Sequence, residues 1–280
     1  MRTTLAIFGL SVLLGVGACA GIPAPAERQE AAEEIASEAG LAPRTIETRP
    51  FDLLGRTRKP APGGLLTIYI EGDGFAWERR GKRSTDPTPI DPLALKLAAA
   101  DPATAVAWLA RPCQFTGGAK ARNCTSDRWT AGRYGEEVVS AMNEALDVLK
   151  REAGASRLAL VGYSGGGAIA ALLAIRRTDI VWLKTVASPL DTEAFTSFHK
   201  VTPLSASLNP AESAGALAHL PQIHYVGEED NIVPARIGRR FLARMDDTGC
   251  AALVVLPGFG HRDGWAEAWH RLAGETPACR

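Results

Sequence analysis

The chain has 280 residues, of which 46% are hydrophobic and 22% charged, with 31 Lys and Arg against 31 Asp and Glu. This length and hydrophobic fraction support one large folded domain and exclude a disordered chain. Because the formal net charge is zero, electrostatics provide no reason to expect a nucleic-acid partner, and none is predicted.

The N-terminal segment combines one positive charge with a short apolar run. Arg2 precedes apolar residues 5–16, a run about as long as the hydrophobic region of a signal peptide and shorter than the ~20 residues that span a bilayer. Residues 16–19 read VGAC, which resembles a bacterial lipobox. The resemblance implies a signal peptide over 1–18, a lipid on Cys19 and attachment to the cell envelope. Ala20 favours the outer membrane or periplasmic face; an uncleaved short anchor is the alternative.

Four other cysteines remain, and an even number in an oxidising compartment predicts two disulfides. Three pairings are possible. We favour Cys113 with Cys124, which closes a short loop, and Cys250 with Cys279, which ties the C-terminus to a strand starting near Ala251. Because His and Cys nowhere have zinc-like spacing, no metal site is predicted.

Residues 19–43 are interpreted as a lipidated cysteine, a tether and a short polar helix over Glu27–Ala39, and residues 44–280 as the folded domain. The predicted strands are Leu65–Ile70, Thr104–Leu109, Arg157–Val161, Ile180–Ala187, Ile223–Val226 and Ala251–Leu256. The predicted helices are Pro92–Ala100, Glu136–Arg151, Gly165–Arg176, Ala235–Met245 and Trp265–Leu272. Apolar strands that alternate with helices indicate an α/β fold, a mostly parallel sheet with helices on both faces. The non-periodic segment 192–220 is a candidate small cap.

Residues 162–166 read GYSGG and match the pattern GxSxG, directly after a predicted strand and directly before a predicted helix. In such a turn the residues two before and two after the serine must be small, because strand and helix approach closely. The turn exposes the hydroxyl of Ser164 and directs the first helical N–H groups at a developing oxyanion. The pattern alone is weak, and its context carries the interpretation.

A serine hydroxyl becomes a useful nucleophile only when a base accepts its proton and an acid orients that base. Asp230 follows the strand that ends at Val226, and His261 follows the strand that ends at Leu256. All three side chains therefore belong to loops near the carboxyl ends of strands, where parallel sheets bind ligands. Asp191, one strand earlier, is a rival for the acid.

Glu228 and Glu229 are further rivals for the acid, because they precede Asp230 in the same loop. A different reading takes residues 165–170, GGGAIA, as a dinucleotide-binding loop. It is disfavoured because this unit lies in the middle of the chain and residues 163–164 separate the strand from the first glycine.

The residues over about 65–275 resemble the α/β-hydrolase superfamily. The resemblance implies a Ser164–His261–Asp230 triad and an oxyanion hole that includes the N–H of Gly165. The second donor is expected in residues 71–75, EGDGF, with Asp73 as first choice and Gly74 as second. Esterases often have His-Gly in this loop, so the Glu-Gly here argues against a well-known lipase family.

The sequence therefore predicts an envelope lipoprotein that hydrolyses small-molecule carboxylic esters through an acyl-enzyme, without a cofactor, and that meets the membrane through its lipid. An amidase, peptidase or thioesterase with the same triad is one alternative, and a non-catalytic scaffold of the same fold is another. The basic run at residues 79–83 is interpreted as a solvated loop, with attraction of an anionic substrate or headgroup as the alternative.

Overall fold

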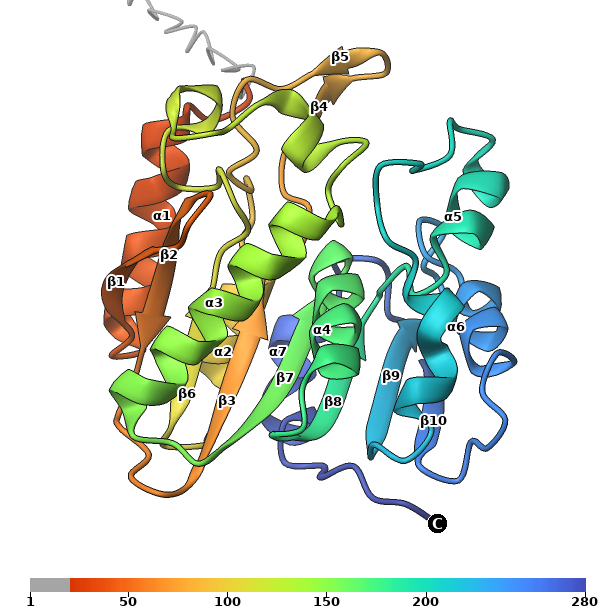
Figure 1. Ribbon diagram of the computed structural model, residues 1–280. Helices are drawn as coiled ribbons and strands as arrows, with labels where there is room; N and C mark the ends of the chain where they lie inside the picture. Colours follow the sequence, from red (N-terminus) through yellow and green to blue (C-terminus); the bar gives the residue numbers. More distant parts are fainter. Residues whose placement is uncertain (1–20) are drawn as a thin grey trace, which may run out of the picture.

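The computed structural model describes residues 21–280. The predicted signal peptide and Cys19 lie outside this range. Within it, eight strands form one sheet in the order β1-β2-β6-β3-β7-β8-β9-β10 (Figure 1). No helix in residues 21–280 has both the length and the hydropathy needed to cross a membrane.

Six neighbouring strands of the sheet are parallel, which confirms the predicted mostly parallel architecture. They are β6 (Val106–Leu109), β3 (Leu65–Ile70), β7 (Arg157–Tyr163), β8 (Ile180–Val186), β9 (Gln222–Gly227) and β10 (Ala251–Leu256). All four residues of β6, and five of the six in β3, are buried. Burial on both faces explains why the central strands are apolar throughout rather than alternating.

An antiparallel pair at one edge was not predicted. β1 (Ala42–Glu47) pairs with β2 (Asp52–Thr57), and β2 pairs antiparallel with β6. Only Ile46 of β1 is buried, because this strand lies at the sheet edge with its other side chains in solvent. An exposed edge strand carries no apolar run, so the pattern that identified the central strands is missing here.

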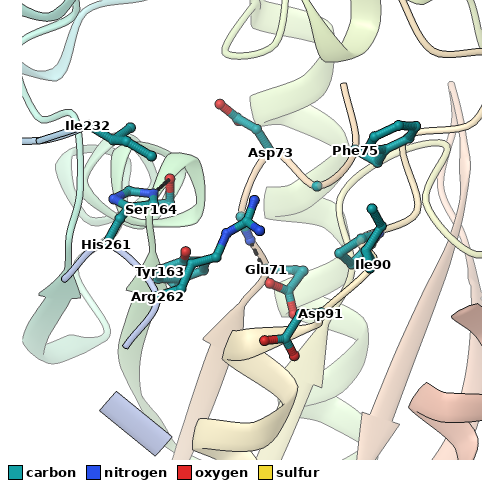
Figure 2. Close-up of a pocket in the computed structure, with 13 residues that line it drawn as sticks. Glu71, Asp73, Phe75, Ile90, Asp91, Tyr163, Ser164, Ile232, His261 and Arg262 are labelled. Carbon is teal, nitrogen blue, oxygen red and sulfur yellow. Dashed lines mark hydrogen bonds between the residues drawn. The ribbon is translucent and has the colours of Figure 1, made fainter. Parts of the chain in front are cut away.

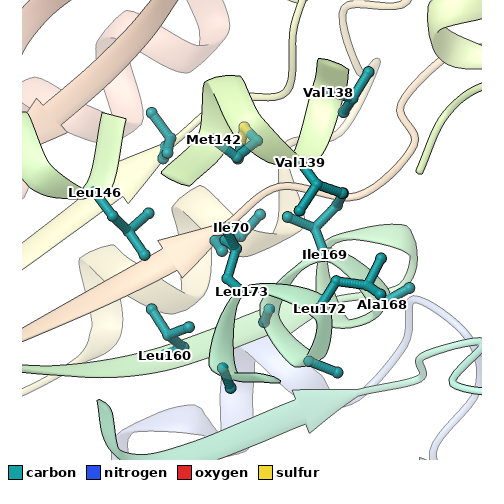
Figure 3. Close-up of a cluster of buried hydrophobic side chains, with 14 of the residues drawn as sticks. Ile70, Val138, Val139, Met142, Leu146, Leu160, Ala168, Ile169, Leu172 and Leu173 are labelled. Atoms are coloured by element: carbon teal, nitrogen blue, oxygen red, sulfur yellow. The ribbon is translucent and has the colours of Figure 1, made fainter. Parts of the chain in front are cut away.

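Helices cover both faces of the sheet, as predicted. One face carries α3 (Glu136–Ala153), α4 (Gly165–Arg176) and α6 (Ala235–Leu242); the other carries α1 (Pro25–Glu38), α2 (Leu93–Ala100) and α7 (Trp265–Leu272). Figure 3 shows part of the first core, in which Val139 of α3 lies beside Ile169 of α4, and Met142 and Leu173 belong to the same cluster. This packing fixes the position of α4, whose first turn begins at the GxSxG motif.

The candidate cap, residues 192–220, contains α5 (Thr192–His199) and the 3-10 helix η3 (Pro210–Leu217). η3 contacts α4 and α6, and α5 contacts α6. His199 Nε2 lies 2.7 Å from the carbonyl oxygen of Ile232, which ties α5 to the loop after β9. A second insertion forms the hairpin of β4 (Trp77–Arg79) and β5 (Lys82–Arg83), which projects above the sheet in Figure 1.

Both favoured disulfides are present: Cys113 pairs with Cys124, and Cys250 pairs with Cys279. The first closes a loop directly after β6. The second joins the C-terminal tail to the residue that precedes β10. This tail has no helix or strand of its own, so the second disulfide is its main constraint.

Replacing Cys250 and Cys279 together by serine is expected to lower the free energy of unfolding by about 3 kcal/mol, because a loop closure of this length is lost from the unfolded chain. Urea unfolding of the oxidised proteins measures the change. The matched control is the Cys113→Ser/Cys124→Ser protein, whose shorter loop predicts a slightly smaller loss. An unchanged urea midpoint for the first variant would contradict the expectation.

Candidate active site

Ser164 lies between β7 and α4 in a strained backbone conformation, with φ 49° and ψ −124°. The adjoining glycines explain how the turn is made. A Cβ on Gly162 would lie 2.4 Å from the carbonyl oxygen of Gly166, and a Cβ on Gly166 would lie 2.2 Å from the carbonyl oxygen of Ile70. Neither position accepts a side chain, because β3, β7 and α4 meet there at backbone distance.

The structure brings Ser164, His261 and Asp230 into one hydrogen-bonded series. Ser164 Oγ lies 3.2 Å from His261 Nε2, and His261 Nδ1 lies 2.9 Å from Asp230 Oδ2. The second carboxylate oxygen, Oδ1, accepts hydrogen bonds from the N–H groups of Ile232 and Val233 at 2.8 and 2.7 Å. The Asp230 side chain is fully buried, so its orientation is fixed by these bonds. The arrangement suits proton transfer from the serine to the imidazole.

The rival acids lie elsewhere. Asp191 Oδ1 accepts a hydrogen bond from the N–H of Ala194 and so caps the first turn of α5, while its Oδ2 lies 3.2 Å from Arg240 Nε. Glu228 and Glu229 are exposed to solvent. Asp230 is the carboxylate that contacts the imidazole of His261.

The loop after β3 lies beside the serine. A Cβ on Gly72 would be 3.1 Å from Tyr163 Cδ1 and 3.4 Å from Ser164 Cβ, so the loop runs close to the nucleophile and a side chain there would crowd Tyr163. Within residues 21–280, the N–H groups of Asp73 and Gly74 have no hydrogen-bond acceptor. Gly165 is the first residue of α4, where N–H groups have no partner within the helix. Asp73 and Gly74 line the same cavity as Ser164, and their N–H groups have unused hydrogen-bonding capacity.

The side chain of Asp73 has a structural role that the sequence did not reveal. Its carboxylate lies against Gly165, where an added Cβ would be 2.0 Å from Asp73 Oδ1. It accepts from Arg133 Nη1 at 2.7 Å, from the Tyr134 hydroxyl at 3.2 Å and from Arg111 Nη1 at 3.3 Å. Burial alone would raise the pKa of Asp73, but the two guanidinium groups hold it below its ordinary value. No local pattern links residues so far apart in the chain.

Glu71 anchors the same loop from the other side. It accepts hydrogen bonds from the N–H of Gly72 at 2.9 Å and from Trp108 Nε1 at 3.1 Å, with longer bonds from the N–H groups of Ala94 and Leu95 in the first turn of α2. Burial raises the pKa of Glu71 to about 7, against the opposing effect of these donors. A fully buried carboxyl therefore holds the start of this loop.

A cavity opens over Ser164 and His261 (Figure 2). Its lining includes residues 71–75 of the loop after β3, the apolar side chains of Ile90 and Ile232, and Arg262. Its aromatic lining residues are Phe75 and Tyr163. Residues 21–280 contain no group of three or more His, Cys, Asp or Glu side chains arranged to hold a metal ion.

No protein-family model matches the chain, and no curated protein matches its sequence. Solved structures do match. Est1E from Butyrivibrio proteoclasticus superposes with a TM-score of 0.56 and 15% identity over 83% of this chain and 96% of its own. An esterase from Pyrococcus furiosus gives 0.55 and 14%, over 85% and 90% of the two chains.

A puromycin-hydrolysing peptidase from Mycobacterium tuberculosis gives a TM-score of 0.59 and 16% identity over 82% of this chain. This chain spans only 37% of that peptidase and 38% of a second puromycin hydrolase. At these identities the likeness concerns the fold. The chain has the α/β-hydrolase fold, as its sequence predicted.

Replacing Glu71 by glutamine is expected to flatten the pH dependence of stability. The folded state retains a proton up to about pH 7 that the unfolded chain loses near pH 4.5, so the free energy of unfolding falls as pH rises between these values. Across that range the wild type should lose up to about 3 kcal/mol relative to Glu71→Gln. Urea unfolding at pH 5, 6, 7 and 8 measures the two slopes. Glu229→Gln, at an exposed position, should keep the wild-type slope; equal slopes for wild type and Glu71→Gln would refute the assignment.

Proposed function

We propose that this chain is a serine hydrolase that cleaves carboxylic esters through a covalent acyl-enzyme. The observation that carries the proposal is the hydrogen-bonded series from Ser164 Oγ through His261 to buried Asp230, which opens into a cavity. The strained backbone conformation of Ser164 adds support. Such strain persists only where the surrounding structure enforces it, and strained residues cluster at active sites.

The first half-reaction begins at the serine. Ser164 Oγ attacks the ester carbonyl carbon while His261 Nε2 accepts the hydroxyl proton, which makes the oxygen a competent nucleophile. Asp230 accepts a hydrogen bond from the Nδ1–H group of the imidazole. This bond fixes the tautomer of His261 and stabilises the imidazolium that forms. The product of this step is a tetrahedral intermediate that carries a negative oxygen.

The oxyanion is stabilised by backbone N–H groups. Gly165 contributes the N–H at the start of α4, where the helix dipole adds positive potential. Asp73 contributes the second N–H from the loop after β3, with Gly74 as the alternative donor. The bonds that Asp73 and Glu71 accept hold this loop in place before substrate arrives, so little reorganisation is needed in the transition state.

Collapse of the intermediate breaks the bond to the leaving alcohol, and the His261 imidazolium donates its proton to that oxygen. Water then attacks the acyl-enzyme with His261 as the base, and the cycle releases a carboxylic acid and restores Ser164. Every proton moves between the substrate, water and these side chains, so the proposed reaction includes no cofactor.

Amide or thioester cleavage uses the same three side chains, and the puromycin-hydrolysing neighbour is a peptidase. Nothing in the triad encodes the leaving group, so esters, anilides and thioesters belong in one assay panel. We also propose that Cys19 carries a lipid that holds the protein at the bacterial cell envelope, as the residues before it indicate.

A fluorophosphonate probe is expected to label purified wild-type protein once, on Ser164, because only an activated serine reacts readily. Ser164→Ala and His261→Ala should abolish labelling and lower the rate of p-nitrophenyl ester hydrolysis by several orders of magnitude. Intact mass and peptide mapping give the readout. Ser205→Ala, which removes an exposed serine outside the cavity, is the matched control and should label normally. A folded wild-type protein that stays unlabelled would favour the non-catalytic scaffold.

Two variants distinguish between Asp230 and Asp191 as the acid of the triad. Asp230→Asn should keep the fold and lower kcat on the order of 10³- to 10⁴-fold, because the imidazole loses the partner that fixes its tautomer. Asp191→Asn should leave kcat within a few-fold of wild type and change stability only slightly, because asparagine still caps α5 and only the charge facing Arg240 is lost. Steady-state kinetics with urea unfolding of each protein tests both statements. The reverse pattern would reassign the acid to Asp191.

A further inference from the structure

The cavity over Ser164 contains four charged side chains besides the His261–Asp230 pair: Glu71, Asp73, Asp91 and Arg262. A charge in a partly enclosed cavity normally has a partner, because water no longer screens it fully. We therefore ask which of these four side chains has a partner within the protein and which one is free to bind a ligand.

Each of the three carboxylates is already compensated. Glu71 faces N–H donors from the first turn of α2 and from Trp108. Asp73 lies between two guanidinium groups, as described above. Asp91 Oδ1 is 2.5 Å from Lys96 Nζ, a residue of α2 outside the cavity lining. None of these carboxylates requires a cation from a substrate.

Arg262 has no such partner. Within residues 21–280 no carboxylate lies within 4 Å of its guanidinium, and its hydrogen-bonding neighbour is the neutral hydroxyl of Tyr163. Its backbone directly follows His261, and Figure 2 shows the side chain extending into the cavity toward the loop after β3. It passes beside Tyr163: burial raises the pKa of that phenol, and the neighbouring guanidinium opposes the rise. Arg262 is exposed to solvent, so the cavity lining presents one guanidinium that no carboxylate of the described residues neutralises.

The basic run at residues 79–83 differs from Arg262, because some of its charges have carboxylate partners. Its residues belong to the β4–β5 hairpin and are outside the cavity lining. Lys82 is paired with Glu78, and Arg83 lies 2.7 Å from Asp127. Charge in the hairpin is therefore partly neutralised, while charge beside the serine is not.

We propose that Arg262 binds an anionic group of the substrate, so that the preferred esters carry a carboxylate or phosphate close to the scissile bond. The planar guanidinium offers parallel N–H donors that match either anion in a bidentate pair. The exposed apolar side chains of Ile90 and Ile232 line the same cavity and suit the carbon skeleton between anion and ester. This inference rests on the proposed hydrolase function and narrows its substrate class.

Paired substrates that differ by one charge test the inference. On the acyl side, the 4-nitrophenyl monoester of glutaric acid is compared with its methyl-capped neutral analogue; on the alcohol side, 4-acetoxybenzoate is compared with methyl 4-acetoxybenzoate. The wild type should prefer the anionic member of at least one pair in kcat/KM. Arg262→Gln should reduce that ratio about 10- to 100-fold, and because the ratio compares two substrates on one protein it corrects for any general loss of activity. Arg239→Gln removes the same charge from exposed α6 and should keep the wild-type ratio.

A binding measurement tests the role of Arg262 without relying on catalytic turnover. Glutarate and 4-hydroxybenzoate are titrated into Ser164→Ala protein by calorimetry, with and without Arg262→Gln, and at two salt concentrations. Binding that weakens with added salt and is lost in the double variant supports the inference even if no ester is cleaved. Equal anion-to-neutral ratios in wild type and Arg262→Gln, together with equal binding, would overturn it. Failure of fluorophosphonate labelling would instead count against the hydrolase itself.

Discussion

The buried carboxylate of Asp73 is the contact on which the candidate site depends. It presses against Gly165 at the start of α4 and is held from behind by Arg111, Arg133 and Tyr134. A buried carboxylate without such partners would cost several kcal/mol, so the network must be complete for the loop to remain in place. It thereby holds the loop after β3 against the turn at Ser164, where both line the cavity.

Glu71 completes this support on the opposite side of the loop, through the N–H of Gly72 and the first turn of α2. The two acidic residues thus connect the loop to both layers of helices. The site is consequently built from groups fixed by the cores on both faces of the sheet rather than from a free surface loop. Such fixed donors stabilise a developing charge without reorganising, which is the main physical requirement of an oxyanion site.

The sequence predicted the parallel strands because buried strands are apolar throughout, and their bounds agree with the structure to within two residues. Ser164, Asp230 and His261 could be grouped because loops at the carboxyl ends of parallel strands converge. The edge strand β1 was missed because its side chains face solvent. The bonds of Arg111 and Arg133 to Asp73 were missed because they join residues far apart in the chain, and charged side chains are normally exposed.

The Cys113–Cys124 disulfide has a consequence for how firmly the site is supported. The segment between β6 and α3 supplies Arg111 and Arg133 to Asp73, and Gln114 Nε2 donates to the carbonyl oxygen of Gly72 at 2.9 Å. That segment has little regular structure, and the disulfide constrains it between these contacts. In a reducing compartment the support behind the serine would be held by weaker local contacts alone. Formation of the Cys113–Cys124 bond therefore helps to fix the segment that supports the site, and its reduction would loosen that segment.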